Sequence, residues 1–331
     1  MKRWIAGLMF AAVATAPAWA QKEVTIGYQD MVVPYRIAQE AKEVEKQTGY
    51  KVSWKQFGGG GEVIKAMASN AVQIGEVGSA GIAASVSRGE PLELFWILDD
   101  IGDAEALVAK NGSGINTIAD LKGKKVAMPF NSTTHFHMMV ALEQAKVNPA
   151  DVQILNMRPP EVRAAWQRGD IQATFIWDPV LAEVKKDGKV ITSSGKISAE
   201  TGKATFDGYV VNKDWAKANR DFMVKFVKIM AASDDSYRKN AAKWTAATPE
   251  VKAVAKWSGA KPEDVPAGMA LYRFPNAQEQ ATKWLGGGKN GLAAKALAAT
   301  AEFQLSQKQI EKVLPDYSVA VNPTYAQEAA K

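Results

Sequence analysis

The feature that most constrains the fold is a repeated order of short apolar run, turn and helical segment. In the first part of the chain, apolar runs occupy residues 23–28, 51–57, 73–77 and 91–98. The order recurs between residues 118 and 192, with further runs at 124–128, 152–157, 173–177 and 189–192. Strands that alternate with helices in this way predict α/β layers around mainly parallel sheets.

The last third of the chain changes character and has a mostly helical pattern. If this tail packs back on the first unit, the chain crosses between two lobes near Glu105–Lys110 and near Phe206–Val211. We therefore predict a lobe 1 of residues 21–106 and 210–331, with a helical C-terminal tail, and a lobe 2 of residues 107–209. Two crossings make a hinge, and ligands bind in the cleft between such lobes.

The first twenty residues have the pattern of a secretory signal peptide. Lys2 and Arg3 precede an apolar run, and an Ala-x-Ala pattern ends at Ala20. Cleavage there would start the mature chain at Gln21. The apolar run is too short for a comfortable membrane span, and no later stretch is long and apolar enough. The sequence therefore predicts a soluble product exported to the periplasm.

The chain contains no cysteine, which excludes a lipid anchor on cysteine, a cysteine nucleophile and thiolate metal sites. An exported protein of 331 residues must then be held together by its core, which a chain of that length can bury. The formal net charge of +6 falls to +4 once Lys2 and Arg3 are removed. The remaining positive charges are scattered among acids, so a nucleic-acid partner is not indicated.

A turn between an apolar run and a helical segment carries three successive hydroxyl residues. The run 124–128 ends at Pro129, and Ser132, Thr133 and Thr134 follow where the helix is expected to begin. Free backbone N–H groups and the positive end of a helix dipole bind a small anion at such a turn. An equally simple interpretation is that Ser132 or Thr133 only caps the helix.

Two turns in the first lobe have a similar arrangement. The glycines of residues 58–61 match neither phosphate-loop pattern, but bare backbone at Gly59 can approach a ligand closely. Ser79 follows Gly78 at the start of another helical segment. If two lobes face each other, these turns meet at the carboxyl ends of the strands. This convergence predicts a ligand cleft, although each turn alone is also compatible with an ordinary connection.

The two histidines and Trp177 are candidate ligand contacts. His135 and His137 are two residues apart on a predicted helix, so they point to different sides and no metal site is expected. His135, nearer the helix start, is the better candidate to donate a hydrogen bond to a ligand. Trp177 ends an apolar run, where an indole could cover an amine or belong to the core.

Three acids lie at predicted turns or crossings: Asp30, Glu105 and Asp207. Acids are usually solvated, but Glu105 and Asp207 flank the two crossings and would balance a ligand cation there. N–H groups and hydroxyls for an anion, with carboxylates and an aromatic ring for an amine, suit a small zwitterion. No Gly-x-Ser-x-Gly or His-Glu-x-x-His motif is present, so no enzyme is predicted, although a paired-carboxylate site stays open.

Several stretches of the chain resemble the taurine-binding periplasmic proteins of sulfonate ABC importers. They are Val72–Gly75, Gly78-Ser79, Glu105–Val108, Ser132–His135, Ala164–Asp170, Trp177 and the region from Asp207 to Asp214. The resemblance spans the mature chain. It implies a type II periplasmic binding protein fold, with two α/β lobes joined by two hinge strands, no cofactor and a monomeric state. It also implies that the protein delivers taurine or a related sulfonate to a membrane permease driven by an ATPase.

The resemblance also implies roles for individual residues. Ser79, Thr133 and Thr134 would help to bind the sulfonate, Glu105 and Asp207 would hold the ammonium, and Trp177 would line the cavity. The sequence departs from the family pattern in the first lobe, where Gly58 and Gly59 replace an Asp-Ser pair, Val33 replaces an acid and Asp30 adds one. Another small sulfonate or zwitterion as ligand, and an enzyme or sensor on the same fold, therefore stay open.

Overall fold

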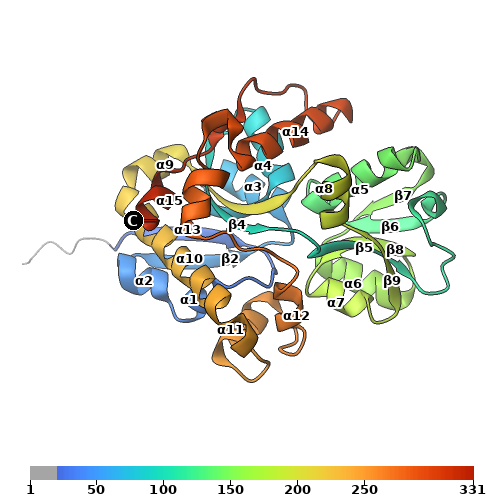
Figure 1. Cartoon of the computed structure of the whole chain (residues 1–331), viewed down its shortest axis with the longest axis horizontal. Coiled ribbons are helices and arrows are strands. Elements are labelled where there is room, and N and C mark those ends of the chain that lie inside the picture. Colours follow the sequence, from blue (N-terminus) through green and yellow to red (C-terminus); the bar gives the residue numbers. More distant parts are fainter. Residues whose placement is uncertain (1–20) are drawn as a thin grey trace, which may run out of the picture.

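The computed structural model describes residues 21–331, which form two α/β lobes joined by two connections (Figure 1). The predicted signal peptide lies outside the described residues. Within residues 21–331, no helix combines the length and the apolar character that a membrane span requires. The prediction of an α/β protein with two lobes is confirmed.

The sheet of lobe 1 has five strands in the order β2-β1-β3-β10-β4. Their bounds are β1 Glu23–Tyr28, β2 Lys51–Gln56, β3 Ile74–Gly78, β4 Leu92–Asp100 and β10 Phe206–Asn212. Strand β1 is parallel to β2 and β3, whereas β10 is antiparallel to β3 and β4. The carboxyl ends of β1, β3 and β4 consequently lie at one edge of the sheet, and β10 begins at that same edge.

The sheet of lobe 2 repeats this plan in the order β7-β6-β8-β5-β9. Its strands are β5 Glu105–Lys110, β6 Lys125–Met128, β7 Gln153–Asn156, β8 Ala173–Trp177 and β9 Gly188–Ser193. Strand β6 is parallel to β7 and β8, and β5 is antiparallel to β8 and β9. Each lobe therefore holds one antiparallel strand, β10 in lobe 1 and β5 in lobe 2. In both cases it is the first strand after the chain enters from the other lobe.

Helices cover both faces of each sheet (Figure 1). Those of lobe 2 are α5 Thr133–Gln144, α6 Pro159–Arg168, α7 Val180–Val184 and α8 Ser194–Thr201. Those of the first part of lobe 1 are α1 Arg36–Glu40, α2 Glu43–Thr48, α3 Gly60–Ala68 and α4 Ser79–Ser87. Hydrophobic side chains from both sheets and their helices form two buried clusters, one of which runs from lobe 1 to the face of the second sheet covered by α6 and α7.

The helical tail packs back on lobe 1, with α14 against α4, α10 against α2 and α15 against β4. Its helices are α9 Lys213–Ala218, α10 Arg220–Asn240, α11 Pro249–Ser258, α12 Val265–Met269, α13 Ala277–Glu279, α14 Leu292–Ser306 and α15 Thr324–Ala329. The end of α14 also reaches the second lobe, because Phe303 packs edge-on against Phe136 of α5 at a centroid distance of 5.3 Å.

Two predicted helices differ from the structure. The sequence pattern of residues 34–47 favours one helix, but the structure divides it into α1 and α2, because Lys42 adopts a left-handed conformation with φ 55°. The pattern of residues 277–285 also favours one helix, but the structure has a short α13 followed by a π-helical turn. In that turn the side chain of Gln280 donates to the carbonyl of Ile97 at 2.6 Å and accepts from its N–H at 2.9 Å.

The connections between the lobes are shorter than the predicted crossings. Residues 101–104 join β4 to β5, and residues 202–205 join α8 to β10. They lie side by side, with 3.5 Å between the amide nitrogen of Ile101 and the carbonyl oxygen of Thr205. The boundaries expected after residues 106 and 209 thus fall inside β5 and β10, because strand pairing assigns each strand to one sheet as a whole.

Candidate functional site

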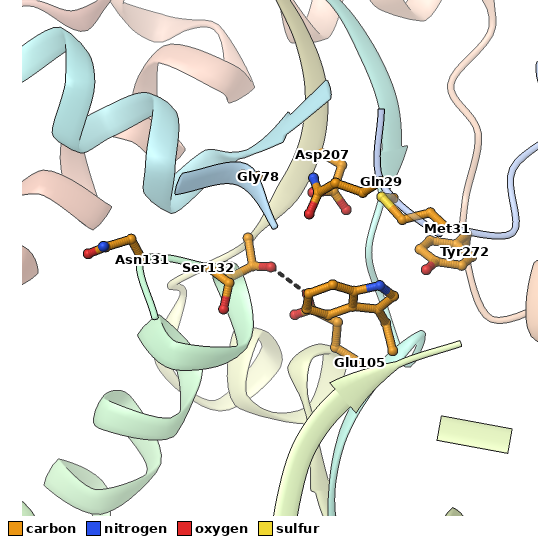
Figure 2. A pocket seen from close by; sticks show the side chains of 11 residues that line it. Gln29, Met31, Gly78, Glu105, Asn131, Ser132, Asp207 and Tyr272 are labelled. Carbon is orange, nitrogen blue, oxygen red and sulfur yellow. Dashed lines mark hydrogen bonds between the residues drawn. The ribbon is translucent and has the colours of Figure 1, made fainter. Parts of the chain in front are cut away.

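A small cavity lies where the two lobes meet, at the carboxyl-terminal edge of both sheets (Figure 2). The residues around it come from both lobes and from the tail: Gln29, Met31, Gly60, Gly78, Glu105, Asn131, Ser132, Thr133, Trp177, Asp207 and Tyr272. The space open to the centre of a water molecule is only about 10 Å³, roughly enough for one water. None of these lining residues is Lys, Arg or His, so the cavity has two acids and no cationic side chain.

Lobe 1 contributes bare backbone to the cavity at the ends of strand-to-helix turns. Gly78 ends β3 and precedes α4, and Gly60 begins α3. A Cβ added at Gly78 would lie 2.9 Å from Cγ2 of Thr133 and 3.1 Å from Oδ1 of Asp207. Only glycine therefore lets the lobes approach this closely without displacing a neighbour.

Lobe 2 contributes the turn before α5. Ser132 caps the helix, since its Oγ accepts a hydrogen bond from the N–H of His135 at 3.1 Å and donates one to the carbonyl of Pro129 at 2.6 Å. The capping interpretation is therefore confirmed. The twelve-residue helix also points its N-terminus toward the other lobe, a position that favours an anion. Asn131 precedes the cap in the left-handed region, with φ 61°.

The acids Glu105 and Asp207 stand at the starts of the two strands that follow the connections, β5 and β10 (Figure 2). Both are buried. Glu105 accepts hydrogen bonds from the hydroxyls of Thr133 and, at 2.9 Å, of Ser194. Burial raises the pKa of Glu105 to about 7, although these two hydrogen bonds act in the opposite direction. Burial, with the charges of Glu105 and Glu76, holds the pKa of Asp207 well above its usual range.

Trp177 closes another side of the cavity. It ends β8, pairs with Glu105 across the β5–β8 ladder and is buried. Its indole Nε1–H donates a hydrogen bond of 2.9 Å to Oδ1 of Asp30 in lobe 1. Burial raises the pKa of Asp30 to about 6, and the bond from Trp177 opposes that rise. Asp30 therefore acts on the cavity by holding the indole rather than by lining it.

The structure brings five of the ten predicted ligand-binding residues to the cavity lining: Glu105, Ser132, Thr133, Trp177 and Asp207. The other five are Asp30, Gly59, Ser79, Thr134 and His135. The hydroxyl of Ser79 accepts the N–H of Phe206 at 3.3 Å, and that of Thr134 bonds Ser132 at 2.7 Å. Gly59 precedes the lining glycine by one residue, and a Cβ there would lie 3.7 Å from Pro129.

The two histidines have different structural partners. The ring of His135 stacks on that of Phe130 at a centroid distance of 4.5 Å, and Nε2 of His137 bonds the carbonyl of Lys203 at 2.8 Å. Burial lowers the pKa of each to about 4, so both rings are neutral at physiological pH. Across residues 21–331 there is no group of three or more metal-ligating side chains arranged to hold an ion.

Sequence reasoning missed six of the lining residues: Gln29, Met31, Gly60, Gly78, Asn131 and Tyr272. Gly60 and Gly78 lie in turns that the sequence marks, and Asn131 directly precedes the three hydroxyl residues. Tyr272 comes from the tail, between α12 and α13, and no motif marks it. A signal for Gln29 existed in its position directly after β1, next to Asp30.

Gln29, which lines the cavity, is held in place by the buried ion pair of Arg36 and Glu76. Its backbone N–H donates to Oε1 of Glu76 at 3.1 Å, and its carbonyl accepts from Nη2 of Arg36 at 2.5 Å. The same Nη2 lies 3.4 Å from Oε2 of Glu76, and both side chains are fully buried. Tyr35 donates its hydroxyl to Glu76 as well. Arg36 is thus engaged by protein groups.

Comparison with known proteins gave three main findings. Residues 22–259 match the family model described as the substrate binding domain of an ABC-type glycine betaine transport system. The chain is 35% identical over 320 residues to the taurine-binding periplasmic protein of Escherichia coli, covering 96% of this chain and 98% of that protein. Two solved structures share the fold at lower identity, and both are of sulfonate-binding proteins.

The first is the alkanesulfonate-binding protein from Xanthomonas axonopodis pv. citri bound to MOPS. It has a TM-score of 0.72 and 22% identity, and the match covers 88% of this chain and 96% of that one. The second is the periplasmic aliphatic sulphonate binding protein of Escherichia coli, with a TM-score of 0.68 and 21% identity over 93% of this chain and all of that one. These likenesses confirm the predicted periplasmic binding protein fold.

Proposed function

The chain belongs to the family of substrate-binding domains of ABC-type transport systems, and from that premise we propose that it binds taurine or a similar small aminosulfonate in the periplasm for import. In this proposal the protein acts as a monomer. It delivers the ligand to a membrane permease coupled to an ATPase, and it binds its ligand without changing it. The 35% identity to a taurine-binding protein along nearly the whole chain supports the ligand class.

The observation that carries the proposal is the pair of buried acids in a cavity without a cation. Glu105 and Asp207 line the space together, and no lysine, arginine or histidine lines it with them. A ligand ammonium between the two carboxylates would supply the missing positive charge. A primary ammonium suits them better than a quaternary one, because it can donate hydrogen bonds to both acids.

The opposite end of the ligand would lie against uncharged donors. The N-terminus of α5, with Asn131, Ser132 and Thr133, and the backbone near Gly60 and Gly78 offer N–H and hydroxyl groups to an anion. A sulfonate remains ionised at all physiological pH values and needs no proton from the protein. One molecule with both ends therefore matches the site better than a plain alkanesulfonate or an alkylamine.

Access to this site would require the lobes to part. The present cavity has room for about one water molecule, and the two adjoining connections, 101–104 and 202–205, are the natural hinge. On this proposal the structure is a closed form, in which the bond between Trp177 and Asp30 joins the lobes.

The proposal is tested by thermal-shift and calorimetric titration of residues 21–331 with taurine, ethanesulfonate, β-alanine, glycine betaine and sulfate. A ligand present at a hundred times its dissociation constant should add about 2.7 kcal/mol to the free energy of unfolding. We expect taurine to give the largest shift and the tightest binding. The absence of binding by any sulfonate would overturn the assignment.

The ammonium role is tested separately by Asp207→Asn, which keeps the shape of the side chain and removes its charge. We expect the affinity for taurine to fall by about 2–5 kcal/mol, since one partner of a buried charge pair is lost. Ethanesulfonate, which has no amine, should bind the variant and the wild type within about threefold of each other. Equal losses for the two ligands would contradict the role. Asp100→Asn, at a partly exposed acid paired with Arg273, is the control.

A further inference from the structure

Asp99 is a buried acid that the proposed ligand contacts do not use. It lies near the end of β4, directly opposite Asp207 in the antiparallel ladder of β4 and β10, so the two side chains share one face of the sheet. Asp99 is fully buried, and neither of its oxygens meets a hydrogen-bond donor in the described part of the chain. It does not line the cavity, whereas Asp207 does.

The groups around Asp99 are mostly acidic. Those close enough to influence its charge come from several elements: Asp207 on β10, Glu76 on β3, Glu105 on β5, Asp100 on β4 itself and Tyr272 of the tail. The two nearby cations are already engaged, because Arg36 bonds Glu76, Tyr35 and Gln29, and Arg273 pairs with Asp100 and Glu279. Asp99 and Asp207 therefore adjoin each other with no cation of their own.

Two adjoining carboxyls in such surroundings cannot both be ionised without a large cost, and they keep a proton. Burial and the charge of Asp207 hold the pKa of Asp99 well above its usual range. A protonated Asp99 can donate its O–H to Asp207, and a hydrogen bond from Asp99 lowers the pKa of Asp207 relative to what burial alone would give. One proton held by the two acids leaves the pair with a single negative charge beside the cavity.

We propose that Asp99 and Asp207 hold one proton between them in the ligand-free protein and that the ammonium of the ligand displaces this proton to solvent. The inference rests on the proposed function, because it requires a ligand with an ammonium at Asp207. Asp99 is then a positioning residue, which acts on the ligand through Asp207. The arriving ammonium and the departing proton each carry one positive charge, so the charge at the acid pair is the same before and after binding.

The consequence is a binding affinity that depends on pH only for ligands with an amine. Where the pair releases one full proton, the affinity for taurine should rise by up to about tenfold for each unit of pH. Ethanesulfonate places no cation at the pair and should show no such slope. Replacing Asp99 by asparagine removes the shared proton, and the amide can still donate to Asp207.

The test is calorimetry with taurine and ethanesulfonate in phosphate and in Tris, which differ in ionisation enthalpy and so report the number of protons released. We expect the wild type to release up to about one proton more than Asp99→Asn with taurine and no extra proton with ethanesulfonate. Any proton that Glu105 releases contributes to both proteins, so the difference isolates Asp99. At pH 6 Asp99→Asn should bind taurine more tightly than the wild type, and the two should converge by pH 8.5.

Equal proton release by the wild type and Asp99→Asn would overturn the inference, as would weaker taurine binding by the variant at every pH. Asp99→Ser serves as a second variant if the first does not fold, and it too should lose the extra proton. Glu161→Gln, at an exposed acid of α6, should behave as the wild type. If taurine does not bind the wild type, the proposed function fails, and the proton count is made with β-alanine. Failure of both amines to bind overturns the inference as well.

Discussion

Two groups of buried charge lie on the sheet of lobe 1, and they differ in how the charge is balanced. At the first, Glu76 of β3 faces Arg36 of α1, accepts the hydroxyl of Tyr35 and accepts the N–H of Gln29 at 3.1 Å. At the second, Asp99 and Asp207 face each other on β4 and β10 with no cation beside them. Both groups are buried, so exposure does not distinguish them.

The difference separates a structural role from a binding role. A buried charge with a full set of partners stabilises one arrangement of the chain, and here it fixes the backbone of Gln29. Burial without a cation destabilises the ionised form of an acid. A ligand that brings a positive charge to such an acid is therefore bound favourably. Breaking the first group should therefore reduce folding stability, whereas breaking the second should mainly change ligand binding.

The largest effect should come from removing one member of the balanced pair. Arg36→Met leaves Glu76 buried without its cation, and we expect the free energy of unfolding to fall by about 3–5 kcal/mol in urea titrations. The double variant Arg36→Met/Glu76→Gln leaves no unpaired charge and should lose less than the single variant. A single variant that is no less stable than the double would contradict the interpretation of this group as a structural ion pair.

Sequence could not reveal this first group, because its members are brought together only by the fold. Arg36 lies on a helix and Glu76 on the third strand of the sheet, and neither stands in a motif. Asp99 was missed for a similar reason. It follows the apolar run 91–98, which predicts a strand, and its partner on β10 is reached only after the whole of lobe 2.

Local sequence signals, in contrast, mark the bounds of two helices. Helices α6 and α11 begin with prolines and end before Gly169 and Gly259, which adopt positive φ at the C-cap. Sequence also placed Glu105 and Asp207 beside the interlobe connections. It could not give the orientation of His135, whose ring stacks on Phe130, because proximity to a helix start does not determine where a side chain points.

The next largest effect is the pH dependence of folding stability that comes from Glu105, the other buried acid of the cavity. Burial raises the folded-state pKa of Glu105 to about 7, above its value of about 4.3 in an unfolded chain. The folded state then binds more protons, so this contribution is present at low pH and is lost as the pH rises through 7. Between pH 5 and 8, wild-type stability should fall by up to about 3 kcal/mol more than that of Glu105→Gln.

Urea unfolding of the ligand-free protein across that pH range measures the slope. Glu161→Gln is the control, because Glu161 is exposed and a hydrogen bond from Arg158 lowers its pKa. It should therefore be ionised throughout the range, and the slope of this variant should match that of the wild type. Parallel slopes for Glu105→Gln and the wild type would show that Glu105 does not hold a proton in the folded state.

A smaller effect is expected at Gly78, where lobe 1 approaches Thr133 of lobe 2. In Gly78→Ala the new methyl would lie 2.9 Å from Thr133 and 3.1 Å from Asp207, and its φ of −69° suits alanine. We expect taurine affinity to fall by about 1–3 kcal/mol, because overpacking opposes closure, with little change in stability, since the lobes can part. Gly59→Ala has 3.7 Å of room and should bind taurine as the wild type does. Equal affinities for the two variants in calorimetry would exclude a role for close packing at Gly78.

The smallest effect concerns Asp30, which is intermediate between the two groups. It has no cation, but it accepts one hydrogen bond, from Nε1 of Trp177 across the cleft. Asp30→Asn keeps the acceptor oxygen and should change taurine affinity by less than about threefold, whereas Trp177→Phe removes the donor and should cost about 0.5–1.5 kcal/mol. A double-mutant cycle with Asp30→Ala and Trp177→Phe measures the coupling directly. If the effects of the two substitutions on taurine affinity simply add, the hydrogen bond does not contribute to closure. A single neutral donor would then not stabilise the buried carboxylate of Asp30.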